Sequence, residues 1–146
     1  MAGPVNVVPS APQLADALTI VRLSLHVFAA CVWVGGQITL GGLVPTLRRE
    51  APQALTAVAR AFARLAWPAY ALLVATGLWS VAAVHASDAS SAWDAVFALK
   101  MALVVAAGVG TLVHQRATTA SLRGAAAAIG TLATVAAMVL GVALAG

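Results

Sequence analysis

Four long apolar stretches, separated by short polar segments, dominate the pattern of hydrophobic and polar positions in this chain. They run over residues 18–43, 65–84, 93–113 and 122–144. A helix needs about 20 apolar residues to cross the hydrocarbon core of a bilayer. The stretches are continuous and lack the alternation typical of strands in a membrane barrel. The pattern predicts an all-α integral membrane four-helix bundle over residues 18–146, preceded by an extracytoplasmic tail at residues 1–17.

Two sequence features bear on where the spans begin and end. Pro45 is expected to end the first span, because proline cannot continue the hydrogen-bond ladder of a helix. Residues 50–64 have an amphipathic pattern. This pattern fits a helical extension of the second span in the lipid headgroups, or alternatively a polar loop.

The arginines predict the orientation of the bundle. They gather in the first and third connections, as Arg48, Arg49, Arg60, Arg64, Arg116 and Arg123. The second connection contains Asp88 and no lysine or arginine. Since positive residues stay in the cytoplasm, both termini are predicted to lie outside. We therefore expect a multi-pass protein of the bacterial cytoplasmic (inner) membrane, with the lipid bilayer as its main partner.

Three tryptophans are expected to mark the membrane boundaries. Trp67, Trp79 and Trp93 lie near the predicted ends of spans. Tryptophan is enriched at the headgroup level of a bilayer.

Composition excludes several classes of protein. The chain is 62% hydrophobic and only 8% charged, whereas a soluble domain contains about 25% charged residues. The net charge of +4 comes from the loop arginines, so it indicates topology and not nucleic-acid binding. The one cysteine, Cys31, excludes an intramolecular disulfide. The sequence also has no CxxC, CxxCH, HExxH or Walker motif.

His26 and Lys100 are the most informative residues, because both lie inside apolar spans. Ionisable groups are costly there and usually serve a function. Each lies roughly 10–12 Å below the predicted outer surface, at 1.5 Å per residue. Two simpler interpretations stay open. Lys100 could extend to the outer headgroups, and His26 could be a neutral imidazole bonded to a neighbouring helix.

Other polar and sulfur-containing side chains are expected on the inward faces. His26, Trp33 and Gln37 share one face of the first span, and Thr76 lies at the level of His26 in the second. Met138 is placed on one side of the fourth span with Thr131 and Thr134, counted at 3.6 residues per turn. His26, Lys100, Thr76 and Met138 fall at a similar level and predict a polar layer in the outer half of the bundle.

The chemistry of this layer suggests a cofactor site. Imidazole and thioether groups bind haem iron and copper. His26, with Met138 or Met101, is the predicted metal-ligand set, and Lys100 could pair with a propionate. The predicted cofactor-binding residues are His26, Lys100, Trp33, Gln37 and Thr76. No carboxylate lies inside a span, which argues against an acidic proton relay.

Several segments resemble one membrane family. Residues 26–36, HVFAACVWVGG, followed by PTLRR at 45–49, look like the first helix of the CopD-type copper-resistance membrane domain. RAFARL at 60–65 with LVATGL at 73–78 resembles its next helix, and LKMALV at 99–104 resembles the one after. The resemblance implies a copper-handling membrane protein.

The same pattern is similar to the HemJ family of small four-helix proteins. That family is associated with protoporphyrinogen oxidation and uses a histidine on the first helix and a lysine on the third. The matching positions are His26 and Lys100.

The sequence thus leads to one main hypothesis and two alternatives. The main hypothesis is a CopD/HemJ-like protein that binds copper or haem/porphyrin in the outer half of the bundle. One alternative is a porphyrinogen oxidase of HemJ type. The other is a structural accessory subunit of a larger membrane complex, without a cofactor of its own. A homo-oligomer or a larger complex is expected in each case, and whether the chain is an enzyme stays open.

Overall fold

The computed structural model describes residues 14–83 and 90–144, and every regular element in them is helical. The elements in chain order are α1 (Ala17–Ala30), the π-helical turn η1 (Cys31–Gly35), α2 (Gly36–Glu50), the 3₁₀ turn η2 (Pro52–Ala54), α3 (Leu55–Ala83), α4 (Ser91–Arg116) and α5 (Ala120–Ala143). They form four continuous helices long and apolar enough to cross a membrane. The predicted all-α membrane four-helix bundle is confirmed.

Polar side chains fix where three of the helices begin. Asp16 caps α1, accepting a 3.0 Å hydrogen bond from the Thr19 backbone N–H. Ser90 and Thr119 cap α4 and α5 in the same way. Each cap satisfies one of the amide groups that lack a partner in the first turn of a helix.

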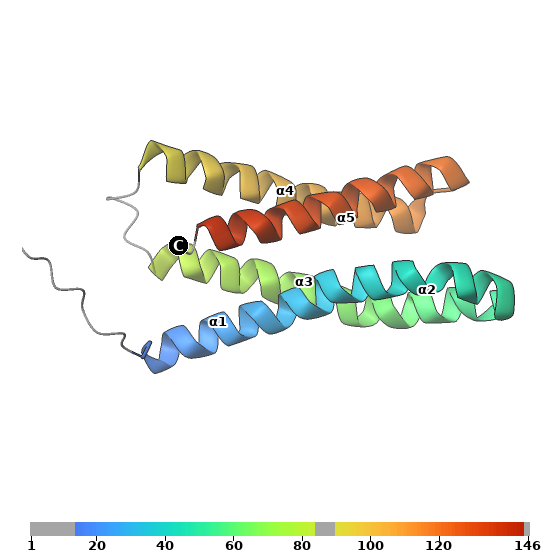
Figure 1. Ribbon diagram of the computed structural model, residues 1–146, viewed down its shortest axis with the longest axis horizontal. Helices are drawn as coiled ribbons and strands as arrows, with labels where there is room; N and C mark the ends of the chain where they lie inside the picture. Colours follow the sequence, from blue (N-terminus) through green and yellow to red (C-terminus); the bar gives the residue numbers. More distant parts are fainter. Residues whose placement is uncertain (1–13, 84–89, 145–146) are drawn as a thin grey trace, which may run out of the picture.

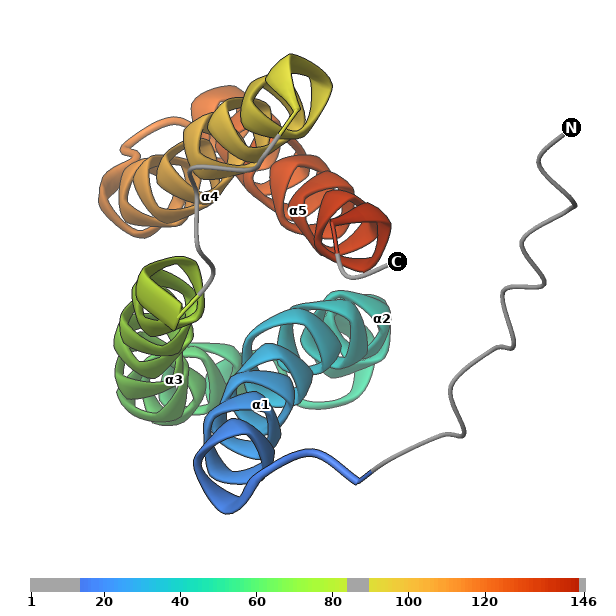
Figure 2. The same cartoon turned by 90° about the vertical axis from the view of Figure 1, so that its left-hand side faces the viewer.

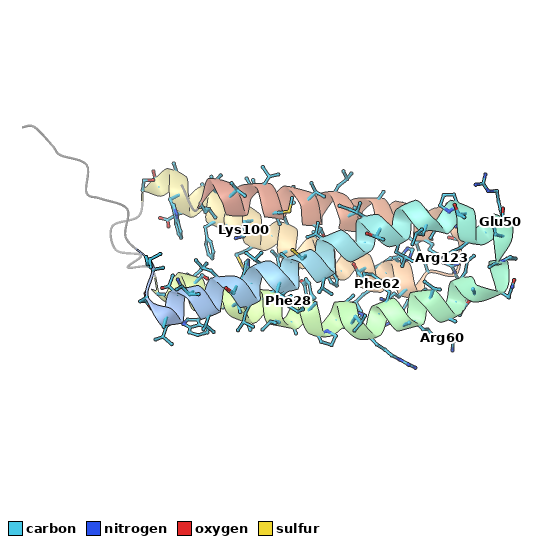
Figure 3. All side chains as sticks on the ribbon, turned by 60° about the horizontal axis from the view of Figure 1, so that its bottom comes forward. Phe28, Glu50, Arg60, Phe62, Lys100 and Arg123 are labelled. Atoms are coloured by element: carbon cyan, nitrogen blue, oxygen red, sulfur yellow. The ribbon has the colours of Figure 1, made fainter. Side chains whose placement is uncertain are left out.

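The helices form two antiparallel pairs, as Figures 1 and 2 show. The first half, residues 17–83, pairs α1, η1 and α2 with α3, and the second half, residues 91–143, pairs α4 with α5. At one end of the molecule α1 and α4 begin and α3 and α5 end (Figure 1). We call it the Asp16 end. The opposite end, where α2 turns into α3 and α4 turns into α5, is the Glu50 end (Figures 1 and 3).

An aromatic cluster packs the first half. Trp33 is only 1% exposed. Its ring centroid lies 4.6 Å from that of Tyr70 and 5.8 Å from that of Trp67. These rings fill the space between η1 and α3, and Phe62 packs against the same cluster.

Small residues pack the second half. A methyl group added at Gly110 of α4 would lie 2.9 Å from the Gly130 Cα and 3.1 Å from the Ala126 carbonyl oxygen, both on α5. The two backbones therefore touch with no side chain between them. In lipid, such close backbone approach is a main source of helix association.

Hydrogen bonds join the two halves near the middle of the molecule. The Trp33 indole N–H donates to the Thr134 hydroxyl at 3.3 Å, and the Tyr70 hydroxyl donates to the Val104 carbonyl at 2.8 Å. These bonds set how the first half sits against the second.

The structure corrects one prediction about helix ends and decides another. Pro45 lies inside α2, which continues to Glu50. A proline is tolerated within a spanning helix because neighbouring groups and local adjustments satisfy the backbone. The next helix, α3, begins at Leu55, and the place of Trp67 at a membrane boundary stays a prediction. That early start confirms the helical extension of the second span over much of residues 50–64, and the polar-loop alternative is wrong for it.

Candidate functional site

His26 is held by a hydrogen bond to the neighbouring helix. Its Nδ1 lies 2.8 Å from the hydroxyl oxygen of Thr76, which is 3% exposed on α3. That hydroxyl also lies 2.7 Å from the Leu72 carbonyl oxygen, to which it donates. A hydroxyl has one hydrogen. Because the Thr76 hydroxyl donates that hydrogen to the Leu72 carbonyl, its oxygen accepts the bond from His26 Nδ1–H.

This chain of bonds assigns the tautomer of His26, which we infer from the hydrogen-bond network. With the hydrogen on Nδ1, the lone pair of the neutral ring is on Nε2. The imidazole of His26 is thus bonded to a neighbouring helix, as in the simpler interpretation, but only through Nδ1. A second ring nitrogen that can accept a proton or bind a metal remains, as in histidines that bind metals through one nitrogen and donate from the other.

Glycines make room for both His26 and Lys100. A methyl group at Gly77 of α3 would lie 3.5 Å from the His26 Cε1, so the imidazole packs directly over this glycine. A methyl group at Gly141 of α5 would lie 3.2 Å from the Lys100 Nζ. Each polar side chain therefore lies against the partner helix of its own half.

His26 and Lys100 lie at the same depth. Each is nine residues beyond the first residue of its helix, Ala17 for α1 and Ser91 for α4. Since both helices begin at the Asp16 end (Figure 1), both residues lie about 13 Å along the helix axis from it. Lys100 is half-buried. Figure 3 labels Lys100 in the Asp16-end half of α4.

Arg22 adds a second cation near this level. It lies one helical turn before His26 on α1, so the two share a face. Its Nε is buried and has no hydrogen-bond partner among the described residues. Two described carboxylates lie at this end, Asp16 and Asp94. Both carboxylate oxygens of Asp16 accept hydrogen bonds from Thr19. The burial of this atom does not follow from the position of Arg22 along the sequence.

A second polar layer lies deeper in the bundle. Trp33 and Gln37 each bond to a threonine of α5 in the second half, whereas His26 bonds to α3. The Thr131 hydroxyl donates to the Gln37 Oε1 at 3.4 Å, while the Gln37 Nε2 is buried without a partner in the described chain. The π-helical turn η1 precedes this residue, and such turns are frequent at functional sites.

The sulfur ligands are placed less favourably than expected. Met138 was predicted to face inward with Thr134, but 47% of it is exposed whereas Thr134 is buried. The buried face of α5 follows small residues, including Gly130, Ala133 and Ala137, and Met138 falls beside that face. Met101 is half-buried.

The remaining histidines and the cysteine lie away from this layer. His114, in the last turn of α4, donates from Nδ1 to the Arg123 carbonyl at 2.9 Å, at the Glu50 end. Cys31 is exposed, and His85 falls outside the described residues. Within residues 14–83 and 90–144, no three His, Cys, Asp or Glu side chains come close enough together to hold a metal ion.

Tyr70 is a structural residue that the sequence reasoning missed. It packs against Trp33, bonds to the Val104 backbone and lies under Gly108, where a methyl group would come within 2.6 Å of its hydroxyl oxygen. One feature of the sequence could have indicated this role. A single tyrosine lies within an apolar span, and its hydroxyl must find a hydrogen-bond partner there.

No protein-family model, curated protein or solved structure matches this chain. The resemblance to the CopD and HemJ families therefore stays a prediction based on the motifs around His26 and Lys100.

Proposed function

We propose that this chain is a CopD/HemJ-like membrane protein that binds an anionic tetrapyrrole, haem b or a porphyrin, near the Asp16 end of the bundle. One observation carries the proposal. His26, whose Nδ1 is bonded to Thr76, lies one helical turn from Arg22 on α1 and at the level of Lys100 along the bundle, and the Nε of Arg22 is buried without a partner in the described chain. A ligand with carboxylates, and in haem an iron that an imidazole could hold, complements this set.

The roles of the residues follow from their positions. His26 would hold the haem iron through Nε2, with its ring oriented by Thr76 through the bond to Nδ1. Lys100 and Arg22 would neutralise the propionates, since hydrogen bonds between ionised partners are about twice as strong as neutral ones. Haem, when bound, supplies one-electron redox chemistry. Trp33 and Gln37 would border the site from the deeper layer.

Copper binding is the weaker form of the same hypothesis. Cu(I) favours soft sulfur ligands together with imidazole. Met101 is half-buried, but Met138 is largely exposed and no cluster of three His, Cys, Asp or Glu side chains exists among the described residues. These observations support a tetrapyrrole over copper.

The proposal is tested on the full chain produced in bacterial membranes and purified in mild detergent, with an absorption spectrum and metal analysis. We expect a Soret band or porphyrin fluorescence in the wild-type protein. The variant His26→Ala should lose it. The variant His114→Ala is the matched control and should keep it, because His114 lies at the opposite end of α4.

Other results would favour the alternatives. Copper in stoichiometric amount without a Soret band would favour a copper-binding protein. Conversion of added porphyrinogen to porphyrin, lost in Lys100→Met, would favour an oxidase of HemJ type. Neither cofactor, together with tight copurification of larger subunits, would overturn the proposal in favour of an accessory subunit.

A further inference from the structure

A surface pocket lies at the Glu50 end, where α4 turns into α5. It has a volume of about 240 Å³ and is lined by Leu112, Val113, Arg116, Ala117 and Leu122. Four of these residues are apolar and one is a cation. The pocket is far from the candidate cofactor site, because Lys100 and Arg116 are sixteen residues apart on the same helix, or about 24 Å.

Polar bonds hold the shape of this turn. The Arg123 guanidinium donates through Nη2 to the Ala117 carbonyl at 2.8 Å. The His114 ring donates to the Arg123 carbonyl at 2.9 Å. Both bonds cross the turn between α4 and α5. The turn that borders the pocket is therefore held in place by side-chain hydrogen bonds.

The pocket lies in a strongly basic end of the molecule. Six of the seven arginines belong to the Glu50 end, namely Arg48, Arg49, Arg60, Arg64, Arg116 and Arg123. Glu50 is the one described carboxylate there; the other two, Asp16 and Asp94, begin helices at the Asp16 end. Figure 3 labels Glu50, Arg60 and Arg123 toward this end.

Depth in the membrane narrows the possible occupants. Leu112 and Val113 belong to the spanning part of α4, and Leu122 to the first turn of α5. All three are partly exposed, at 37%, 37% and 49%. An apolar wall that faces lipid and ends at an arginine matches a molecule with an acyl chain and a negative headgroup.

We propose that this pocket is a binding site for an anionic phospholipid. The acyl chain lies against Leu112, Val113 and Leu122, and the phosphate lies at Arg116. Positive residues are expected on the cytoplasmic side, where anionic lipids are concentrated, so the site faces the leaflet that supplies its ligand. This site is independent of the proposed cofactor site.

Native mass spectrometry tests the site on the full chain in detergent. The protein is titrated with phosphatidylglycerol and with phosphatidylcholine of the same acyl chains. We expect phosphatidylglycerol to bind at a defined stoichiometry, and Arg116→Gln to weaken its binding about fivefold. Arg60→Gln is the matched control, since Arg60 is exposed and outside the pocket, and should change binding by less than about twofold.

A second variant separates the pocket from a general basic surface. Ala117→Leu fills the pocket without changing any charge and should also reduce phosphatidylglycerol binding, with helix content checked by circular dichroism. Three results would overturn the proposal. They are equal binding of the two lipids, equal loss in Arg116→Gln and Arg60→Gln, and full competition by glycerol phosphate, which has a headgroup but no acyl chain.

Discussion

The two halves of this bundle hold their helices together in different ways. In the first half, large rings fill the space between η1 and α3, with Trp33 at 1% exposure against Tyr70 and Trp67. In the second half, α4 and α5 touch through backbone at Gly110 and Gly130. Lipid gives helices no hydrophobic reason to associate, so each half relies on close packing by a separate route.

The difference bears on how the candidate site is built. Each half forms its own tight pair, and the bonds between the halves, such as Trp33 to Thr134, are few and polar. His26 belongs to the first half and Lys100 to the second. The candidate site is therefore shared by two units that are each well packed.

The largest predicted effect tests the aromatic half. Trp33→Ala removes a fully buried ring and its bond to Thr134, and should lower the free energy of unfolding in detergent by about 3–5 kcal/mol. Trp79→Ala, at a position that is 42% exposed, is the control and should cost less than about 1 kcal/mol. Similar losses in the two variants would contradict the aromatic cluster as the core of this half.

Gly110→Ala tests the small-residue half. The new methyl group would press on the Gly130 backbone, which cannot move aside as a flexible side chain can. We expect a loss of about 1–3 kcal/mol, measured by the same denaturation. Gly124→Ala places its methyl group in open space and should change stability by no more than about 0.5 kcal/mol. A tolerated alanine at residue 110 would mean that α4 and α5 do not touch there.

Gln37→Leu tests the junction between the halves. The Gln37 Nε2 is buried without a partner in the described chain, so its removal relieves an unsatisfied donor. We expect a gain in stability of about 1 kcal/mol. Thr131→Val, which leaves the Gln37 Oε1 without its donor, should instead cost about 0.6 kcal/mol. A clear loss in Gln37→Leu would show that a partner outside the described residues satisfies this amide.

The smallest effect concerns pH at the start of α1. The hydrogen bond from the Thr19 backbone N–H, and then that from the Thr19 hydroxyl, lower the pKa of Asp16 below its usual value. A lowered pKa in the folded state means that the cap is fully present above the usual aspartate pKa of about 3.9, and is lost as the pH falls through the lower value. The protection of the Thr19 amide, measured as its exchange rate relative to the intrinsic rate at each pH, should be constant around neutral pH and fall only in that acid range. A loss of protection already near pH 6 would exclude the cap.

The apolar pattern was sufficient to predict the four helices. Spacing could do this because a continuous helix carries its periodicity directly in the sequence. Two details could not be predicted from this pattern. Pro45 stays inside α2, and Met138 is exposed although its spacing matches Thr134. Spacing shows which residues of α5 share a face. The contact of Gly130 with Gly110 determines which face is buried, and this contact joins two segments that are distant in the sequence.

The candidate site was predictable only in part. The level of His26 and Lys100 follows from counting residues along two helices. The tautomer of His26 does not, because it depends on whether the Thr76 hydroxyl donates to a backbone carbonyl or to the imidazole ring. The burial of the Arg22 Nε could not be predicted either, because packing against neighbouring helices determines whether one atom is buried.

Equilibrium titration of the detergent-purified protein with haem measures the affinity of the proposed site itself. We expect saturable binding at one haem per chain, strongly weakened in His26→Ala and in Lys100→Met but unchanged in His114→Ala. Binding that is equally strong in the wild-type protein and in the His26→Ala and Lys100→Met variants would contradict the proposal.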